Sequence, residues 1–161
     1  MPIRNLYYKI LNNLCILQRT KLQIMVQNIE SLIPHRAPFL FVDEITSYTK
    51  ESIVGYKTFD DKDNWLKGSF PDLDFIPGTI LIESMAQCGG AGVKLLGITD
   101  GIFGLVSIES AEFFGGARFG DHVKFVVENV RLSEKIIKQQ GTAFIDEKTI
   151  LKASWMCVKI S

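Results

Sequence analysis

Hydrophobic and polar positions along the chain predict one long apolar helix, from about Thr79 to Leu96. Apolar residues occupy almost every side of this segment, and helices of that kind are normally buried on most of their sides. A Pro-Gly pair just before it suits a helix entry. Gly89, Gly90 and Gly92 lower its helix propensity, so we expect neighbouring groups to pack closely against them.

Six other segments have the alternation and the β-branched or aromatic content of strands, two before the helix and four after it. They are Phe39–Tyr48, Ile53–Phe59, Ile102–Phe113, Val123–Leu132, Lys135–Ile145 and Thr149–Ile160. A polar loop is expected at residues 60–64. A short helix is expected to begin near Gln27 and to end within residues 31–36, because Pro34 and Pro38 prevent its continuation.

Only a sheet can cover so apolar a helix in a chain of this length. The order of the elements therefore predicts an α+β fold, in which a curved antiparallel sheet of about six strands wraps a long buried central helix.

Composition narrows the function classes. The chain has 161 residues and zero formal net charge, which fits one domain and gives no reason to expect nucleic-acid binding. Its three cysteines are far apart and lack the spacing of zinc ligands, so we expect no disulfide framework and no zinc site. We also expect no other metal and no cofactor. A reducing cytoplasm fits best. No run is long and apolar enough to span a membrane.

Residues 1–24 differ from the rest of the chain. They contain four basic residues and no acidic one, so the remainder carries a net charge of −4. Their apolar residues recur at helical spacing, which predicts a basic amphipathic extension. A targeting segment is an alternative, and so is a start assigned too far upstream, because Met25 would itself make a sensible beginning. We therefore divide the chain into an extension, 1–24, and one domain, 25–161.

Two motifs carry the function. Residues 32–43 read LIPHRAPFLFVD (the first motif), and residues 68–87 read GSFPDLDFIPGTILIESMAQ (the second motif). With a weaker match at residues 111–121, they resemble the β-hydroxyacyl-acyl-carrier-protein dehydratases over roughly residues 27–160. The resemblance implies a hot-dog fold, a dimer with a continuous sheet, and an acyl tunnel at the interface. It implies too that the two members of the catalytic pair come from opposite subunits. It also implies that a carrier protein delivers the substrate on a phosphopantetheine arm.

Elimination of water from a 3-hydroxyacyl thioester needs one group to remove an α-proton and another to protonate the leaving hydroxyl. The resemblance assigns the acid to Glu83, and a partly apolar tunnel would favour its protonated form. It assigns the Gly78 N–H, at the helix start, as donor to the thioester oxygen. Ser69 stands where the family has its catalytic His. A serine hydroxyl is essentially never ionised near neutral pH unless a base activates it.

Phe70, Pro77 and Gln87 complete the candidate site as substrate-binding residues. Gln87 lies one turn beyond Glu83, where it is placed either to hydrogen-bond that carboxyl or to be an ordinary surface polar residue. A role as a turn or cap residue explains Ser69 at least as well as a catalytic role does. The chain has two histidines, His35 and His122, and neither is an obvious replacement in sequence. Cys88 is expected to be a small buried hydrophobe; Phe75, Phe113 and Trp155 are candidate tunnel-lining residues.

Other positions depart from the family pattern. Ala37 replaces an aromatic residue, Asp72 and Asp74 add negative charge, and Phe114-Gly115 replaces a basic pair. Fewer basic residues should weaken docking of an acidic carrier protein. Three basic residues elsewhere are candidates to compensate: Lys67, Arg118 and Lys124.

Three functions remain open at this point. The first is a 3-hydroxyacyl-acyl-carrier-protein dehydratase-like hydro-lyase of fatty-acid or related acyl-chain biosynthesis, with Glu83 as acid and Ser69 or a water held by it assisting. The second is a non-catalytic hot-dog subunit that pairs with an active paralogue. The third is an acyl thioesterase in which Glu83 activates water. Each implies an acyl-carrier-protein or acyl-CoA thioester as ligand, and a homodimer, a higher homo-oligomer or a heterodimer as assembly.

Overall fold

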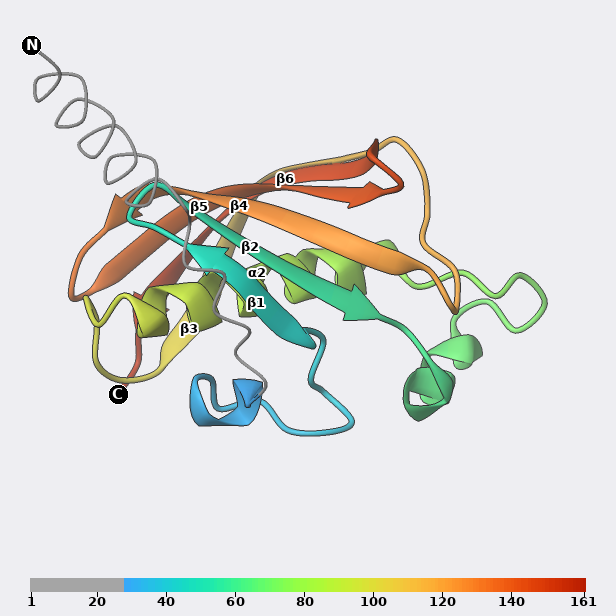
Figure 1. Cartoon of the computed structure of the whole chain (residues 1–161), viewed down its shortest axis with the longest axis horizontal. Coiled ribbons are helices and arrows are strands. Elements are labelled where there is room, and N and C mark those ends of the chain that lie inside the picture. Colours follow the sequence, from blue (N-terminus) through green and yellow to red (C-terminus); the bar gives the residue numbers. More distant parts are fainter. Residues whose placement is uncertain (1–27) are drawn as a thin grey trace, which may run out of the picture.

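The computed structural model describes residues 28–161, and the predicted extension at residues 1–24 lies outside them. One six-stranded antiparallel sheet curves around a central helix (Figure 1). The strands are β1 (Glu44–Tyr48), β2 (Ser52–Thr58), β3 (Phe103–Phe113), β4 (His122–Leu132), β5 (Ile136–Ile145) and β6 (Lys148–Lys159), and the helix is α2 (Gly78–Leu95). This arrangement confirms the predicted α+β fold with its wrapped helix.

The sheet order is β1-β2-β4-β5-β6-β3, and each neighbouring pair is antiparallel. β1 and β3 are therefore the two edge strands. Most of β3 is exposed, including large apolar side chains at Leu105, Val106, Ile108 and Phe113. Long, exposed and apolar edge strands are normally covered or paired in native proteins.

Helix α2 is buried as its apolar pattern predicts, and Cys88 at its middle is fully buried. Two of its glycines are required by close packing. A Cβ at Gly89 would overlap the side-chain amide of Gln139 on β5, and a Cβ at Gly92 would overlap Ile53 on β2. A Cβ at Gly90 would make only an ordinary van der Waals contact, 3.8 Å from the Ile33 side chain, so close packing explains two of the three glycines.

The first predicted strand, at residues 39–48, is shorter than expected: only residues 44–48 pair as a strand. The reason is local. The N–H of Phe41 donates to the side chain of Gln87 on α2, 2.8 Å away, so this backbone hydrogen-bonds to the helix and not to the sheet. The preceding helical turn, η1 (Ile29–Ser31), is a single 3₁₀ turn.

The prediction of a polar loop at residues 60–64 is wrong, because Asp61–Gly68 forms a 3₁₀ helix, η2. Asp60 caps it, accepting from the Lys62 N–H at 2.9 Å, while the Asp63 carboxylate accepts from the Asp60 N–H at 3.2 Å. Asp63 also pairs with Lys57 of β2 at 3.1 Å, and both side chains are buried. This buried ion pair fixes η2, which carries the chain into the second motif.

Among residues 28–161, no helix is both long enough and apolar enough to cross a membrane.

Candidate active site

Glu83 projects from α2 into a cavity of about 180 Å³, which we call the Glu83 cavity. Its side chain is 21% exposed. The walls come from the first motif, α2, the start of β3, β5 and β6, and they include Ile33, His35, Gln87, Leu105, Ile137 and Cys157. One carboxylate thus faces a partly apolar cavity, as the second motif leads one to expect.

Gln87 holds Glu83 in place. The Phe41 N–H can only donate, so the Gln87 oxygen, 2.8 Å away, must face it. The Gln87 amide nitrogen therefore faces the other way and donates to Glu83 Oε1 at 2.9 Å and to the Phe39 carbonyl at 3.3 Å. Gln87 is 2% exposed, so the predicted hydrogen bond between Glu83 and Gln87 is confirmed and a surface role is excluded.

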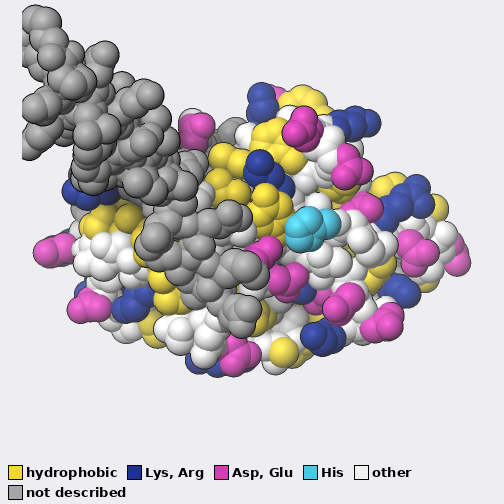
Figure 2. Space-filling view, in the orientation of Figure 1, with side chains coloured by type: hydrophobic (Ala, Val, Ile, Leu, Met, Phe, Trp, Pro, Cys, Tyr) yellow, Lys and Arg dark blue, Asp and Glu magenta, His cyan; other side chains and the backbone are white. Residues whose placement is uncertain are grey.

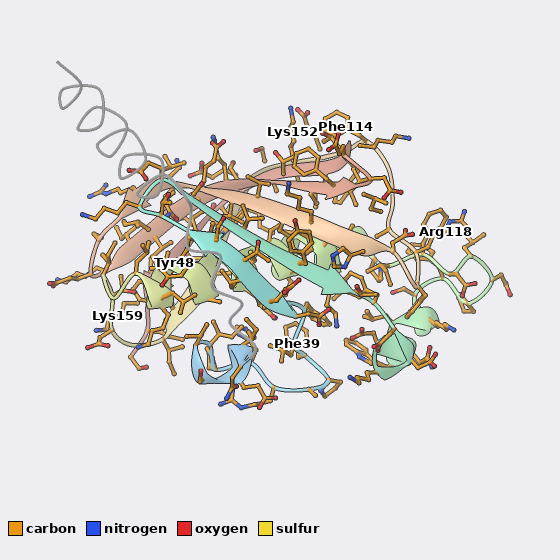
Figure 3. The ribbon with its side chains drawn as sticks, viewed as in Figure 1. Phe39, Tyr48, Phe114, Arg118, Lys152 and Lys159 are labelled. Atoms are coloured by element: carbon orange, nitrogen blue, oxygen red, sulfur yellow. The ribbon has the colours of Figure 1, made fainter. Side chains whose placement is uncertain are left out.

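His35 is the residue that sequence reasoning missed. Its Nε2 lies 3.4 Å from Glu83 Oε1, and both residues line the Glu83 cavity. The ring packs beside Phe39, with 6.2 Å between ring centroids, in the loop that Figure 3 shows leading from η1 to β1. The Nδ1 atom is buried and has no hydrogen-bond partner among the described residues. Sequence separation hides this contact, because 48 positions separate His35 from Glu83.

Cys157 of β6 shares the Glu83 cavity. Burial and the nearby charge of Glu83 together raise the pKa of the Cys157 thiol to about 11. Burial alone raises the pKa of Cys88 still further. Neither thiol is therefore an activated nucleophile. Within residues 28–161, no cluster of three or more His, Cys, Asp or Glu side chains is arranged to hold a metal ion.

Gly78 and Phe70 line a second cavity of about 430 Å³, which we call the Gly78 cavity. Its walls are mostly aromatic and aliphatic, and they include Phe75, Ile76 and Phe113. A Cβ at Gly78 would lie 2.5 Å from the Phe113 ring of β3, so a larger residue fits here only if that side chain moves. The first N–H groups of a helix have no intrahelical acceptor, and no side chain caps this one. The two cavities share no lining residue.

Ser69 and Pro77 line neither cavity. Ser69 is exposed and forms the C-cap of η2, with its N–H donating to the Leu66 carbonyl at 3.0 Å. Pro77 forms the N-cap of α2, and its carbonyl accepts from the Ile80 N–H at 2.9 Å. Within one subunit, the structure thus brings Glu83 to Gln87 and Phe70 to Gly78, but it does not bring Ser69 to Glu83.

Of the three basic residues that are candidates to compensate, Arg118 contacts a residue that lines the Gly78 cavity. Arg118 packs over the Phe75 ring at 4.5 Å, at the end of the molecule that carries η2 (Figure 3). Lys67 packs over Phe119 at 4.9 Å. The third, Lys124, lies on the outer face of the sheet in another hollow. On the face shown in Figure 2, acidic and basic side chains are interspersed without a field of one sign.

Comparisons with known proteins agree with this architecture. Residues 33–154 match the FabA-like domain family. The chain is 32% identical to a 3-hydroxyacyl-[acyl-carrier-protein] dehydratase FabZ of Aliarcobacter butzleri, over 81% of this chain and 93% of that protein. It is 33% identical to the FabZ of Thermotoga maritima, over 80% of this chain and 92% of that protein.

Two solved structures show the fold. The dehydratase heterocomplex ApeI:P from Xenorhabdus doucetiae has a TM-score of 0.72 at 15% identity, over 83% of this chain and 91% of that chain. A hypothetical thioesterase with coenzyme A from Streptococcus pneumoniae has a TM-score of 0.57 at 16% identity, over 82% of this chain and 91% of that chain. Fold, motifs and relatives lead to one conclusion: the chain belongs to the FabA-like family of hot-dog proteins that includes the FabZ dehydratases.

Proposed function

We propose that this protein binds 3-hydroxyacyl thioesters beside Glu83 and dehydrates them, as a member of the acyl-chain biosynthetic machinery of the cytoplasm. The observation that carries the proposal is the hydrogen-bonded chain from the Phe41 N–H through Gln87 to Glu83 Oε1. It fixes one carboxylate at the wall of a cavity, and an oriented proton-transfer group is the first requirement of such an elimination. The identity to FabZ dehydratases supports the same substrate class.

One subunit holds only part of the site. The Glu83 cavity measures about 180 Å³, whereas small-molecule sites usually measure about 300–1,000 Å³. The exposed apolar edge of β3 offers a surface for a second copy. We therefore propose a homodimer, paired along β3, that encloses the acyl chain between its subunits.

The Gly78 cavity is the proposed entrance for the thioester end of the substrate. Its mouth is apolar, and the uncapped start of α2 presents N–H groups, of which Gly78 would donate to the thioester oxygen. Phe70 and Pro77 would contact the phosphopantetheine arm, and Ser69, exposed at the end of η2, would hydrogen-bond to it. Arg118, which packs over Phe75 in the wall of this cavity, suits the acidic surface of an acyl carrier protein.

The proposal is tested by hydration and dehydration turnover with crotonyl and 3-hydroxyacyl thioesters of several chain lengths, on acyl carrier protein and on coenzyme A. Glu83→Gln should lower kcat by about 10²–10⁴-fold, the usual range for one acid–base group. Glu51→Gln, in the exposed turn between β1 and β2, is the matched control and should leave turnover unchanged. Free thiol released by the wild type, without enoyl product, would instead indicate a thioesterase.

A second candidate is a subunit that pairs with a His-bearing paralogue. One observation favours it: Ser69 stands where the family has its catalytic His. The ApeI:P neighbour is itself a heterocomplex, so the fold is compatible with unlike pairing. Native mass and turnover of the purified protein together decide between the two candidates. A homodimer that turns over substrate does not need a paralogue.

A further inference from the structure

Replacement of the family His by Ser69 leaves the proposed dehydration without its second acid–base group. Two histidines remain, and the structure places them very differently. His122 begins β4, hydrogen-bonds through Nδ1 to Thr58 Oγ1 at 2.8 Å, and stacks on Tyr56 with 4.8 Å between ring centroids. It lines a hollow that includes neither Glu83 nor Gln87. His35 lines the Glu83 cavity itself.

We propose that His35 is the second catalytic group, and that it works with Glu83 of the same subunit in place of a His at position 69. The proposal rests on the dehydration proposed above. It follows from the 3.4 Å between His35 Nε2 and Glu83 Oε1 and from their shared cavity.

The two contacts of Glu83 Oε1 lead us to propose which role each group takes. Glu83 Oε1 faces the Gln87 amide group on one side and His35 Nε2 on the other. In the proposed arrangement His35 carries a proton on Nε2, so that Glu83 Oε1 accepts from both neighbours as an ionised carboxylate. Glu83 is therefore placed to remove the α-proton as a base, and His35, protonated at Nε2, is placed to act as the acid. This assignment reverses the acid role that the sequence predicts for Glu83.

The step balances within the pair. The Glu83 carboxylate takes the α-proton, and the electron pair of that C–H bond forms the carbon–carbon double bond. The C–O bond at the β-carbon breaks, and the departing hydroxyl takes the proton of the His35 imidazolium and leaves as water. Glu83 has then gained one proton and His35 has lost one. Transfer of that proton across the contact between Oε1 and Nε2 restores both groups.

Packing holds the His35 ring at this contact. Arg36 donates to the carbonyls of Ile33 at 2.9 Å and of His35 at 2.7 Å, which fixes the backbone of the turn. Phe39 lies beside the ring. The 3.4 Å separation is longer than a good hydrogen bond, which spans about 2.7–3.2 Å. Catalytic contacts are often this long before substrate binds and shorten in the complex.

The test compares His35→Gln and His35→Ala with the wild type in the dehydration assay. Glutamine keeps a donor for Glu83 but cannot transfer a proton, so it separates catalysis from positioning. Both variants should lose about 10²–10⁴-fold in kcat, while binding of an amide analogue of 3-hydroxyacyl-pantetheine changes less than about threefold, because the acyl walls stay intact. His122→Gln is the matched control and should keep wild-type turnover. Thermal unfolding of each variant checks that it folds.

A His35→Gln variant that turns over within about threefold of the wild type would overturn the inference, because His35 would then only position Glu83. A wild type that binds the analogue but does not turn over would also overturn it, while leaving the binding part of the proposed function intact. A wild type that fails to bind the analogue would overturn the proposed function itself.

Discussion

Replacing Gln87 by leucine tests the structural basis of the site. Gln87 is 2% exposed and joins three parts of the molecule: the Phe41 N–H, the Phe39 carbonyl and the Glu83 carboxylate. Leucine has a similar volume and no hydrogen-bonding groups. The change therefore removes these bonds while keeping the packing of the helix against the first motif.

The cost can be worked from burial. The Phe41 N–H loses its acceptor in the core, where Phe41 is 0% exposed, and a buried unpaired polar group costs about 1–3 kcal/mol. Glu83 is partly exposed, so water can replace its lost donor. The bond to the Phe39 carbonyl is long at 3.3 Å and contributes little. We expect Gln87→Leu to lower the free energy of unfolding by about 2 kcal/mol.

The chain offers a matched control in Gln140→Leu. Gln140 donates to the Glu128 carboxylate at 2.6 Å, which is shorter than the 2.9 Å between Gln87 and Glu83, but it lies exposed on the sheet. An exposed change of this kind should stay within about 0.5 kcal/mol. Urea unfolding at one fixed protein concentration measures both variants, since oligomers unfold in a concentration-dependent way.

Turnover provides the second measurement. Without Gln87, the Glu83 carboxylate is free to rotate away from the substrate, and misplacement of a catalytic group by about 1 Å can cost about 10²-fold. Equal stability losses for Gln87→Leu and Gln140→Leu would refute the reasoning from burial. Undiminished turnover in Gln87→Leu would refute the claim that Gln87 orients Glu83.

Three further predictions follow from single contacts. Lys57→Met leaves Asp63 buried without its cation and should cost about 3–5 kcal/mol in urea unfolding; a loss below about 1 kcal/mol, the range of exposed pairs, would contradict it. Gly78→Ala should lower stability by about 1–3 kcal/mol through overpacking against the Phe113 ring, and thermal unfolding unchanged from the wild type would show that this ring can move aside. Glu83→Gln removes a charge that raises the pKa of Cys157, so that pKa should fall and site-resolved alkylation of Cys157 at fixed alkaline pH should become faster; an unchanged rate would mean that Glu83 is not ionised beside it.

Much of the fold could be predicted because its signals are local. The all-round apolar pattern from Thr79 onward predicts a buried helix, and period-two segments predict the strands that wrap it. The helix at residues 61–68 was missed because its sequence is polar. Its stability comes from the Asp60 cap and from the ion pair between Asp63 and Lys57, and Lys57 belongs to strand β2, outside the segment.

The sequence predicted Glu83 and Gln87 as residues of the site, but it did not predict that His35 lies beside them. Helical spacing alone suggests the bond between Glu83 and Gln87, because four residues form one turn. The position of His35 depends on how the first motif folds back over α2, and no local pattern encodes that path. The Phe41 N–H bond to Gln87 is what brings the motif there, and its residues are 46 positions apart. Long-range hydrogen bonds of this kind become visible only in the folded chain.

Turnover of 3-hydroxyacyl thioesters by the purified wild type, beside a Ser69→His variant, tests the central claim most directly. The account predicts enoyl product from the wild type, because Glu83 and His35 form a complete acid–base pair without a His at position 69. If the wild type forms no enoyl product and Ser69→His does, the account is contradicted. That result would indicate a dehydratase scaffold that works only with an active partner.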